Sequence, residues 1–242
     1  MLTTYIILSV LAVSAMAFVG VLVLPSENIT QRRWMMFLVA LSAGALLGDA
    51  FIHIIPEAGE LAGDKLPYLI LAGIVIFFAL EKWMHWHHHE GGHSHSSGRM
   101  ILVGDGLHNL LDGVVVASAY LGGGLAVGLA TTLAVAIHEL PQEIGDYAVL
   151  RDVGYTRRKA LTFNLLSGLA AVVGAIATIA IGTYAESITN AILPIAAGGF
   201  IYIASADIFP RLNKDNEGRS ASLVSVQLSG LLVGIIMMSL LA

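Results

Sequence analysis

The sequence contains no cysteine. This absence excludes a disulfide framework and every metal site that depends on thiolate ligands. A metal ion bound by this chain would therefore have to use nitrogen and oxygen donors.

Charged residues are scarce as well. They make up 12% of the 242 residues, whereas 57% are hydrophobic, and the mean hydropathy is +0.81. Soluble globular domains carry about 25% charged residues, so we expect this chain to lie in a lipid bilayer. The formal net charge is −5, and nothing in the sequence indicates a nucleic-acid partner.

Apolar runs long enough to cross a bilayer recur along the whole chain. Crossing takes about 20 helical residues, and the runs are continuous rather than alternating, which favours helices over the strands of a barrel. The sequence therefore predicts an all-α polytopic membrane protein with eight transmembrane helices. The expected spans are Thr3–Leu24, Trp34–Ile55, Leu66–Leu80, Ile101–Tyr120, Leu121–Leu150, Ala160–Gly182, Ile188–Phe209 and Val224–Ala242.

The basic residues indicate how these helices are oriented, because cytoplasmic loops are enriched in Lys and Arg. With eight helices, 11 of the 12 basic residues fall in odd-numbered connections, and only Lys65 lies on the other side. We therefore expect the N-terminus and the C-terminus outside. The 11 are Arg32, Arg33, Lys82, Arg99, Arg151, Arg157, Arg158, Lys159, Arg211, Lys214 and Arg219.

No connection is long enough to separate domains, so residues 1–242 are expected to form one transmembrane domain. The longest connection, residues 84–98, reads MHWHHHEGGHSHSSG and would lie in the cytoplasm between the third and fourth helices. Expression tags are usually terminal and uninterrupted, whereas internal His-rich tracts bind metal through neutral imidazole. We interpret the segment as a cytoplasmic metal acceptor with the ligands His85, His87, His88, His89, His93 and His95.

Ionisable residues recur at bilayer depth, where each costs several kcal/mol unless it is paired or hydrated. Each of them also has a purely structural explanation. A buried His can be a hydrogen-bonded packing residue, a carboxylate can be protonated or paired with Arg, and an amide can bridge two helices. No Lys or Arg lies on the same helix faces to neutralise the acids. The three groups are Asp49, His53 and Glu57 on the second helix; Asp105, His108, Asn109 and Asp112 on the fourth; and His138, Glu139, Gln142, Glu143 and Asp146 on the fifth.

The fourth and fifth helices together predict a central metal site. Their carboxylates would repel one another without a cation or protons, and a divalent ion supplies the positive charge. His108 and Asp112 are four residues apart, so they point at one spot, and the fifth helix completes the shell with His138, Glu139 and either Gln142 or Glu143. Pro141 is expected to loosen that helix beside the ligands. Glycines 104, 106, 113 and 145 are expected to let the two helices approach closely.

At these residues the chain resembles the ZIP (Zrt/Irt-like) family of metal transporters, in particular its LIV-1/GufA-like branch of bacterial type. The resemblance rests on HNLLDG, HELPQEIGD, GDAFIHIIPE and FIYIASADIFP, together with the eight helices and the His-rich loop. It implies a transport site midway through the membrane. It assigns His108, Asp112, His138 and Gln142 to one metal position, and Asn109, Asp112, Glu139 and Gln142 to an adjoining one.

The chain departs from the pattern of this branch in two places. Many members have His where Gln142 stands, and an amide oxygen is expected to lower zinc affinity and favour harder ions. Some prokaryotic members also place a carboxylate from the sixth helix at the second position, where this chain offers only Asn164 and Ser167. Occupation of one or two metal positions therefore stays open.

A route for the ion follows from the expected topology, with an entrance at Asp49 and His53 and an exit at Asp105 and Asp146. We expect a non-enzymatic, multi-pass protein of the cell membrane that moves Zn²⁺, Fe²⁺, Mn²⁺ or Cd²⁺ into the cytoplasm. Its partners are divalent metal ions and the bilayer, with a homodimer open as the assembly. Two alternatives are an intramembrane metal sensor and a zinc protease, since HELPQ begins like HExxH but has Gln142 at the fifth position.

Overall fold

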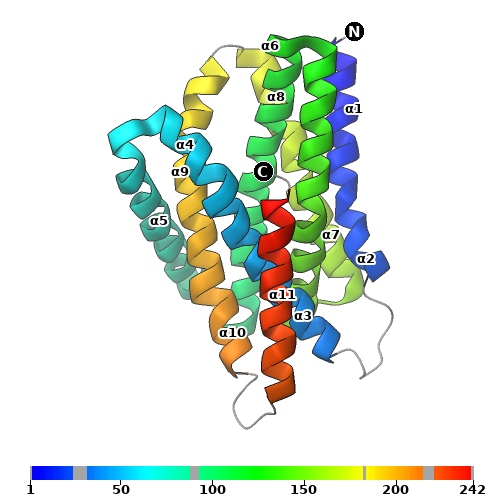
Figure 1. Cartoon of the computed structure of the whole chain (residues 1–242), viewed down its shortest axis with the longest axis vertical. Helices are drawn as coiled ribbons and strands as arrows, with labels where there is room; N and C mark the ends of the chain where they lie inside the picture. Colours follow the sequence, from blue (N-terminus) through cyan, green and yellow to red (C-terminus); the bar gives the residue numbers. More distant parts are fainter. Residues whose placement is uncertain (1, 24–31, 88–92, 182–183, 215–220, 241–242) are drawn as a thin grey trace.

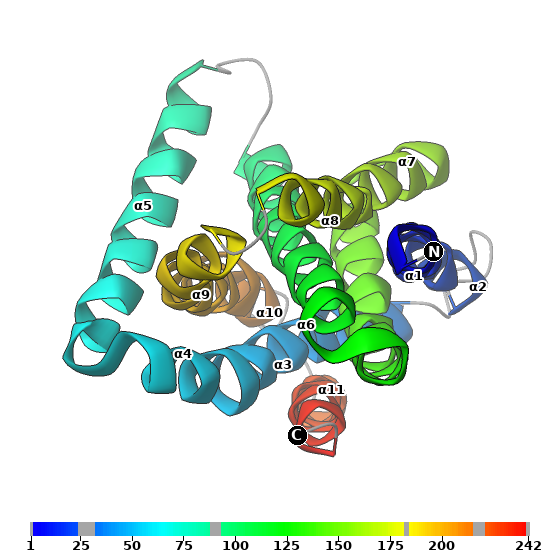
Figure 2. The same cartoon turned by 90° about the horizontal axis from the view of Figure 1, so that it is seen from above.

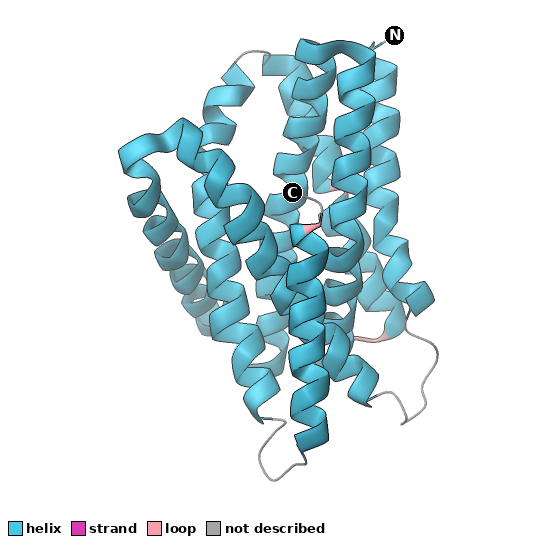
Figure 3. Cartoon of the chain, viewed as in Figure 1, coloured by secondary structure: helices cyan, strands magenta, loops and turns pink. Residues whose placement is uncertain are grey.

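The computed structural model describes residues 2–23, 32–87, 93–181, 184–214 and 221–240. In these ranges the chain is helical apart from short turns, and no strand occurs (Figure 3). The predicted all-α class is confirmed for this part of the chain. It agrees with the membrane environment expected from the composition, since a helix satisfies its own backbone hydrogen bonds in lipid.

The helices form one upright bundle (Figure 1). Two short stretches, η3 and η5, are π-helices inserted in longer helices, and both carry an aspartate of the sequence motifs, Asp49 and Asp207. The elements are α1 (Leu2–Ser14), η1 (Ala15–Phe18), α2 (Val19–Val23), α3 (Arg32–Gly48), η3 (Asp49–Ile54), α4 (Ile55–Ala62), η4 (Gly63–Lys65), α5 (Leu66–His87), α6 (His93–Asp152), α7 (Arg157–Gly168), α8 (Ala170–Ile181), α9 (Tyr184–Tyr202), η5 (Ile203–Ile208), α10 (Phe209–Lys214) and α11 (Ala221–Ser239).

Helix α6 is a hairpin of two arms rather than a single rod. Gly124 has φ 75° and ψ −167°, a left-handed backbone conformation that glycine adopts without a steric penalty. Figure 2 shows α6 turning back on itself, and Gly98, near the first end of α6, lies against Leu150 and Val153 near its other end. The sequence placed the reversal between Tyr120 and Leu121. The structure moves it to Gly124, because a conformation with positive φ needs glycine.

Six helices of the described residues are long and apolar enough to cross a membrane. The stretch Leu2–Phe18 is apolar but shorter, and the candidate Gly98–Asp152 has 55 residues. At 1.5 Å per residue a straight helix of that length would span about 80 Å, more than twice the hydrocarbon thickness, so the break at Gly124 is required. The six candidates are Arg32–Gly59, Gly63–Trp83, Gly98–Asp152, Arg157–Ile181, Ile192–Asn213 and Ser222–Ser239.

Several helix ends differ from the expected spans. Helix α5 extends to His87 and α6 starts at His93, so helix enters both ends of the His-rich segment that the sequence assigned to a loop over residues 84–98. The expected sixth helix begins at Arg157, where Thr156 caps it by accepting a hydrogen bond from the backbone of Lys159. It is interrupted at Leu169, between α7 and α8.

Glycines mark the closest contacts between helices, but not those the sequence predicted. A Cβ on Gly113 would lie 1.9 Å from the carbonyl oxygen of Ala171 in α8, and one on Gly145 would lie 2.4 Å from the Cβ of Ser42 in α3. The expectation that the hairpin glycines bring the two arms together is therefore wrong. The small residues face the neighbouring helices, while the facing sides of the arms carry the polar side chains.

Candidate metal centre

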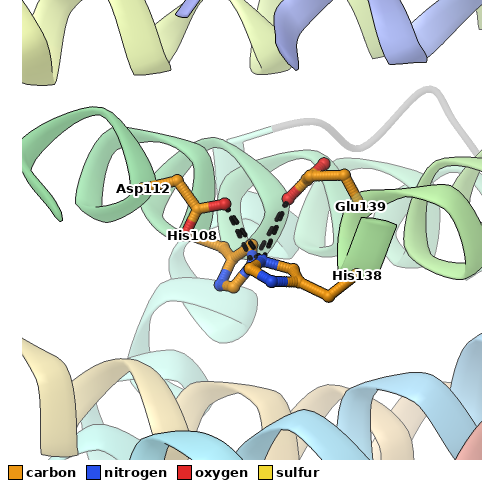
Figure 4. A group of neighbouring side chains, drawn as sticks. All are labelled: His108, Asp112, His138 and Glu139. Carbon is orange, nitrogen blue, oxygen red and sulfur yellow. Dashed lines mark hydrogen bonds and ion pairs between the residues drawn. The ribbon is translucent and has the colours of Figure 1, made fainter. Parts of the chain in front are cut away.

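Both arms of the α6 hairpin supply side chains to one polar cluster in the interior of the bundle. His108 and Asp112 come from the first arm, and His138 and Glu139 come from the second. Figure 4 shows the two carboxylates directed toward the imidazole rings. The i, i+4 spacing on the first arm places both side chains on one face, and the hairpin turns that face toward the second arm.

The distances in this cluster suit a small cation. The Nε2 atoms of His108 and His138 are 3.3 Å apart, and Asp112 Oδ2 lies 3.1 Å from His138 Nε2 and 3.6 Å from His108 Nε2. Glu139 Oε1 lies 3.3 Å from His108 Nε2 and 4.0 Å from His138 Nε2. Donors bound tetrahedrally at 2.0–2.1 Å stand about 3.3 Å apart, so two imidazoles and two carboxylates already lie at nearly the separations that Zn²⁺ requires.

Burial and charge make the cluster unusual. Glu139 is fully buried, and neither of its oxygens accepts a hydrogen bond from the described residues. In that part of the chain, the basic partner in every ion pair of the cluster is a histidine, and no Lys or Arg takes part. Two buried carboxylates with no Lys or Arg partner are costly in a low-dielectric interior, and a divalent cation between them would offset that cost.

The expected entrance residues adjoin this cluster. Asp49, on the π-helix η3, is buried and contacts two histidines: its Oδ1 lies 3.1 Å from His53 Nδ1 and its Oδ2 lies 3.6 Å from His108 Nδ1. The side chain of His53 is 22% exposed, and its ring centroid is 6.3 Å from that of His138. Glu57, the third residue of this group, is exposed. Asp49 and His53 thus connect a more accessible position with the buried donors.

The expected exit residues lie on the other side of the cluster. Asp105 accepts hydrogen bonds from Asn109 at 2.8 Å and from Ser167, and Asp146 accepts one from Ser42 at 3.2 Å. Both carboxylates are buried. Among the described residues, the structure groups Asp105 with Glu139 and Glu143, and Asp146 is in neither of the two groups of potential metal ligands.

Three polar residues that the sequence did not count as site residues hold these carboxylates. Ser167 and Asn164 in α7 donate to Asp105 and Glu143, and Ser42 in α3 donates to Asp146. The sequence weighed Asn164 and Ser167 only as poor substitutes for a carboxylate ligand. Their polarity in an apolar helix was the available signal, whereas Ser42 looks like any small residue in a membrane helix.

Gln142 is fully buried, and both atoms of its amide lack a hydrogen-bond partner among the described residues. Such a side chain is free to turn its oxygen toward an ion. Beside it, the backbone of α6 keeps helical dihedral angles through Pro141, since the only departure is at Gly124. The expected loosening of the helix is therefore limited to the hydrogen bond that the proline nitrogen cannot donate.

An aromatic side chain that the sequence analysis did not count among the site residues also borders the site. The ring of Phe200 in α9 lies 5.2 Å from that of His108, centroid to centroid, and Phe200 is buried in the main hydrophobic core. It packs the imidazole on the side of α9. Phe200 is the first residue of the FIYIASADIFP motif, but the sequence analysis assigned it no role at the site.

The His-rich segment is only partly described. His88 and His89 lie outside the described residues, and so do the side chains of His85, His87, His93 and His95. The prediction that these histidines accept metal stays a prediction.

Comparison with known proteins agrees with the geometry. A family model described as ZIP zinc transporter matches residues 1–100 and 96–242. Human zinc transporter ZIP10 is 38% identical over 178 residues, covering 65% of this chain and 21% of that protein. Zinc transporter zipt-7.1 of Caenorhabditis briggsae is 30% identical over 253 residues, covering 78% of this chain and 64% of that protein. Zinc transporter ZIP13 of Pongo abelii is 34% identical over 198 residues, covering 74% and 59%. The chain thus spans less than two thirds of each of these relatives.

Proposed function

Because the chain belongs to the ZIP family, we propose that it carries Zn²⁺, or a related divalent transition metal such as Fe²⁺, Mn²⁺ or Cd²⁺, across the bilayer into the cytoplasm. It does so as a multi-pass protein of the cell membrane and not as an enzyme. The relatives are named as zinc transporters, which favours Zn²⁺ as the substrate.

The observation that carries this proposal is the group formed by His108, Asp112, His138 and Glu139. One ligand atom from each of them lies within 4.8 Å of the others. Imidazole nitrogens with carboxylate oxygens are a donor set suited to zinc, and they stand inside an apolar bundle where an unpaired charge is unfavourable. A transported ion therefore finds its ligands at the depth where the bilayer resists it most.

The neighbouring polar groups support a stepwise route. Asp49 contacts both the partly exposed His53 and the buried His108, so an ion can exchange ligands between an outer and a central position. Asp105 and Asp146 continue the series toward the open end of the α6 hairpin. A potential of 100 mV, negative inside, drives two positive charges inward by about 4.6 kcal/mol. We therefore assign the direction as uptake.

Eight membrane crossings accommodate this route. The six long apolar candidates become eight if the two arms of α6 each cross once and α1, η1 and α2 together form the first crossing. With that count the basic residues gather on one side, which places the N-terminus and C-terminus outside and the segment of residues 84–98 in the cytoplasm. The histidines of residues 84–98 are then on the side of the membrane where the ion is released, and can accept it.

Two rival functions make different use of the same donors. A metal sensor would bind the ion without releasing it on the other side. A zinc protease would use His138 and Glu139 of an HExxH motif, yet position 142 is Gln, and the remaining donors come from the other arm of the hairpin. Family membership and the donor set favour transport over both.

The test is zinc uptake into sealed proteoliposomes containing the wild-type protein or the double variant His108→Ala/Asp112→Ala. We expect the variant to insert normally and to lose saturable uptake, because two of the four central ligands are gone. The matched control is Glu81→Gln, which alters a partner of Tyr202 away from the metal centre and keeps uptake. Wild-type flux in the double variant would remove these residues from the transport site.

A further inference from the structure

The last residue of α6 is joined to α10 by an ion pair. Arg211 Nη1 lies 2.7 Å from Asp152 Oδ2, and the two side chains are 19% and 23% exposed. An ion pair that is largely screened from water and also hydrogen-bonded is stronger than one on an open surface, yet it can break and form again. Because Asp152 ends the second arm of the hairpin, the ion pair attaches the arm that carries His138 and Glu139 to a different helix.

Exposure differs between the two sides of the central group. On the side of the expected entrance, the side chains of His53 and the adjoining His138 are 22% and 16% exposed. On the side of the expected exit, Asp105 and Asp146 are both buried. The structure therefore combines a more accessible entrance with a closed exit, and the ion pair between α6 and α10 is formed in this state.

The ion pair lies beyond the exit acids on the same arm. Asp152 follows Asp146 by six residues, which is about 9 Å along a helix at about 1.5 Å per residue. At this end of the hairpin Gly98 lies against Leu150 and Val153, so the two arms meet close to the ion pair. An ion that leaves past Asp146 toward the open end of the hairpin therefore moves toward the place where α10 is attached.

The segment that carries Arg211 follows an interruption in the regular helical hydrogen bonds. The π-helix η5 ends at Ile208, and the backbone N–H of the next residue, Phe209, bonds to the carbonyl of Ala204, five residues back rather than four. Pro210 follows and has no N–H to donate. Helices bend at π-bulges and prolines. Helix α10 can therefore turn relative to α9 without either helix unfolding.

Helix α10 is also held by α11. Gln227 of α11 is buried and donates from its Nε2 to the carbonyl oxygen of Leu212 at 3.1 Å. Leu212 and Leu223 of α11 belong to the same hydrophobic core. A neutral hydrogen bond and apolar packing thus attach α10 to α11, whereas opposite charges attach it to α6. The charges are the part of this arrangement that can be removed by one isosteric substitution.

We propose that the Arg211–Asp152 ion pair is a reversible latch. It keeps the exit closed while the ion binds, and its opening lets the end of α6 and α10 separate so that the ion leaves. This inference rests on the proposed transport function. A contact made in the closed state and lost in the open one stabilises the closed state, so removing the contact shifts the population toward the open state.

The first experiment tests whether the latch has to open for transport. Because the chain contains no cysteine, the full-length variant Asp152→Cys/Arg211→Cys can be cross-linked with a flexible, reducible thiol reagent without side reactions at other thiols. We expect cross-linking to lower zinc uptake into proteoliposomes by about tenfold or more, to leave zinc affinity in detergent unchanged, and to be reversed by reduction.

The matched control is Arg33→Cys/Ser222→Cys. These residues are hydrogen-bonded at 3.1 Å between the starts of α3 and α11, which lie at the same end of the bundle as α10 (Figure 1). Helices α3 and α11 also pack closely at Gly44, where a Cβ would lie 2.2 Å from the carbonyl oxygen of Leu231. Cross-linking this pair should leave uptake as it was.

The second experiment measures the opening itself and does not depend on uptake. Spin labels are attached to the exposed positions of Asn213→Cys on α10 and Arg158→Cys on α7, shortly after the end of α6. Double electron–electron resonance then compares the labelled protein with and without Asp152→Asn. We expect the substitution to add or enlarge a component at longer distance, because the closed state loses the ion pair.

Two results would overturn the latch. One is undiminished uptake by the protein cross-linked between positions 152 and 211, and the other is the same distance distribution with and without Asp152→Asn. Absence of uptake by the wild type contradicts the proposed function instead, and the distance measurement then decides on the latch alone.

Discussion

Gln142 is a neutral amide on the arm of α6 that also supplies His138 and Glu139. It is fully buried, without a hydrogen-bond partner among the described residues, and it follows His138 by one helical turn. Replacing it by His adds a nitrogen donor on the same face. We expect Gln142→His to tighten zinc binding by about tenfold, which corresponds to about 1.4 kcal/mol, and to affect Mn²⁺ much less.

The measurement for this variant is the pair of dissociation constants for Zn²⁺ and Mn²⁺, with the corresponding fluxes. Flux need not rise with affinity, because release into the cytoplasm then becomes slower. Gln142→Glu is the matched control, since it adds charge without nitrogen and should not favour zinc over Mn²⁺. If the ratio of the two constants is the same in the wild type and in Gln142→His, Gln142 does not touch the ion.

Individual donors were predictable from the sequence where helical spacing alone brings them together. His108 and Asp112 share a face of one helix, and His138 with Glu139 had to lie opposite, because no basic residue was present to neutralise the acids. The residues that donate hydrogen bonds to these acids were harder to predict from the sequence. Asn164, Ser167 and Ser42 come from helices whose packing against α6 depends on three-dimensional contacts, which no periodicity reveals.

Close packing between the α6 hairpin and its neighbours depends on single glycines. A Cβ on Gly113 would stand 1.9 Å from the Ala171 carbonyl oxygen in α8, whereas one on Gly106 would meet nothing closer than 3.9 Å. Gly113→Ala therefore has to separate α6 from α8, and we expect it to destabilise the protein by about 1–3 kcal/mol. Thermal unfolding in detergent measures this effect.

The control on the same arm is Gly106→Ala. It has room for the added methyl group and gains helix propensity, so its melting temperature should equal or slightly exceed that of the wild type. Equal melting temperatures for Gly113→Ala and the wild type would show that α6 and α8 do not approach as closely as the structure has them.

The His-rich segment of residues 84–98 is expected to accept released metal and not to carry it across the membrane. Replacing its six histidines by serine leaves every donor of the central group in place, since all four lie farther along α6. Zinc affinity at the central group should be unchanged, and uptake should continue. Abolished uptake, with no metal bound between the arms of α6, would reverse the roles of the two regions.

The apolar runs predicted that the helices exist. They did not predict where the helices end or which helices pack against each other. Hydropathy does not distinguish Leu121 from Gly124 as the point of reversal, and only the positive φ of Gly124 decides it. Hydropathy also cannot tell which side a glycine faces. For this reason Gly113 and Gly145 were assigned to contacts between the arms, although they contact α8 and α3.

The molecule as a whole combines a mostly apolar bundle with one buried polar centre. Figure 2 shows the α6 hairpin surrounded by other helices, so its donors are screened from lipid on several sides. Composition alone predicted this class of protein, because a chain with few charges and long apolar runs has no other stable environment. The number of crossings and the direction of transport depend on the basic residues in the connections, and both remain proposals.

The central claim is that the ion bound between the arms of α6 is carried across the membrane, not merely held there. Zinc accumulation in sealed proteoliposomes with an imposed negative-inside potential tests this most directly. We predict saturable accumulation of many zinc ions per protein, released by a zinc ionophore and accelerated by the potential. Zinc retained only in proportion to the protein, with none inside the vesicles, would contradict transport and identify a metal-sensing protein.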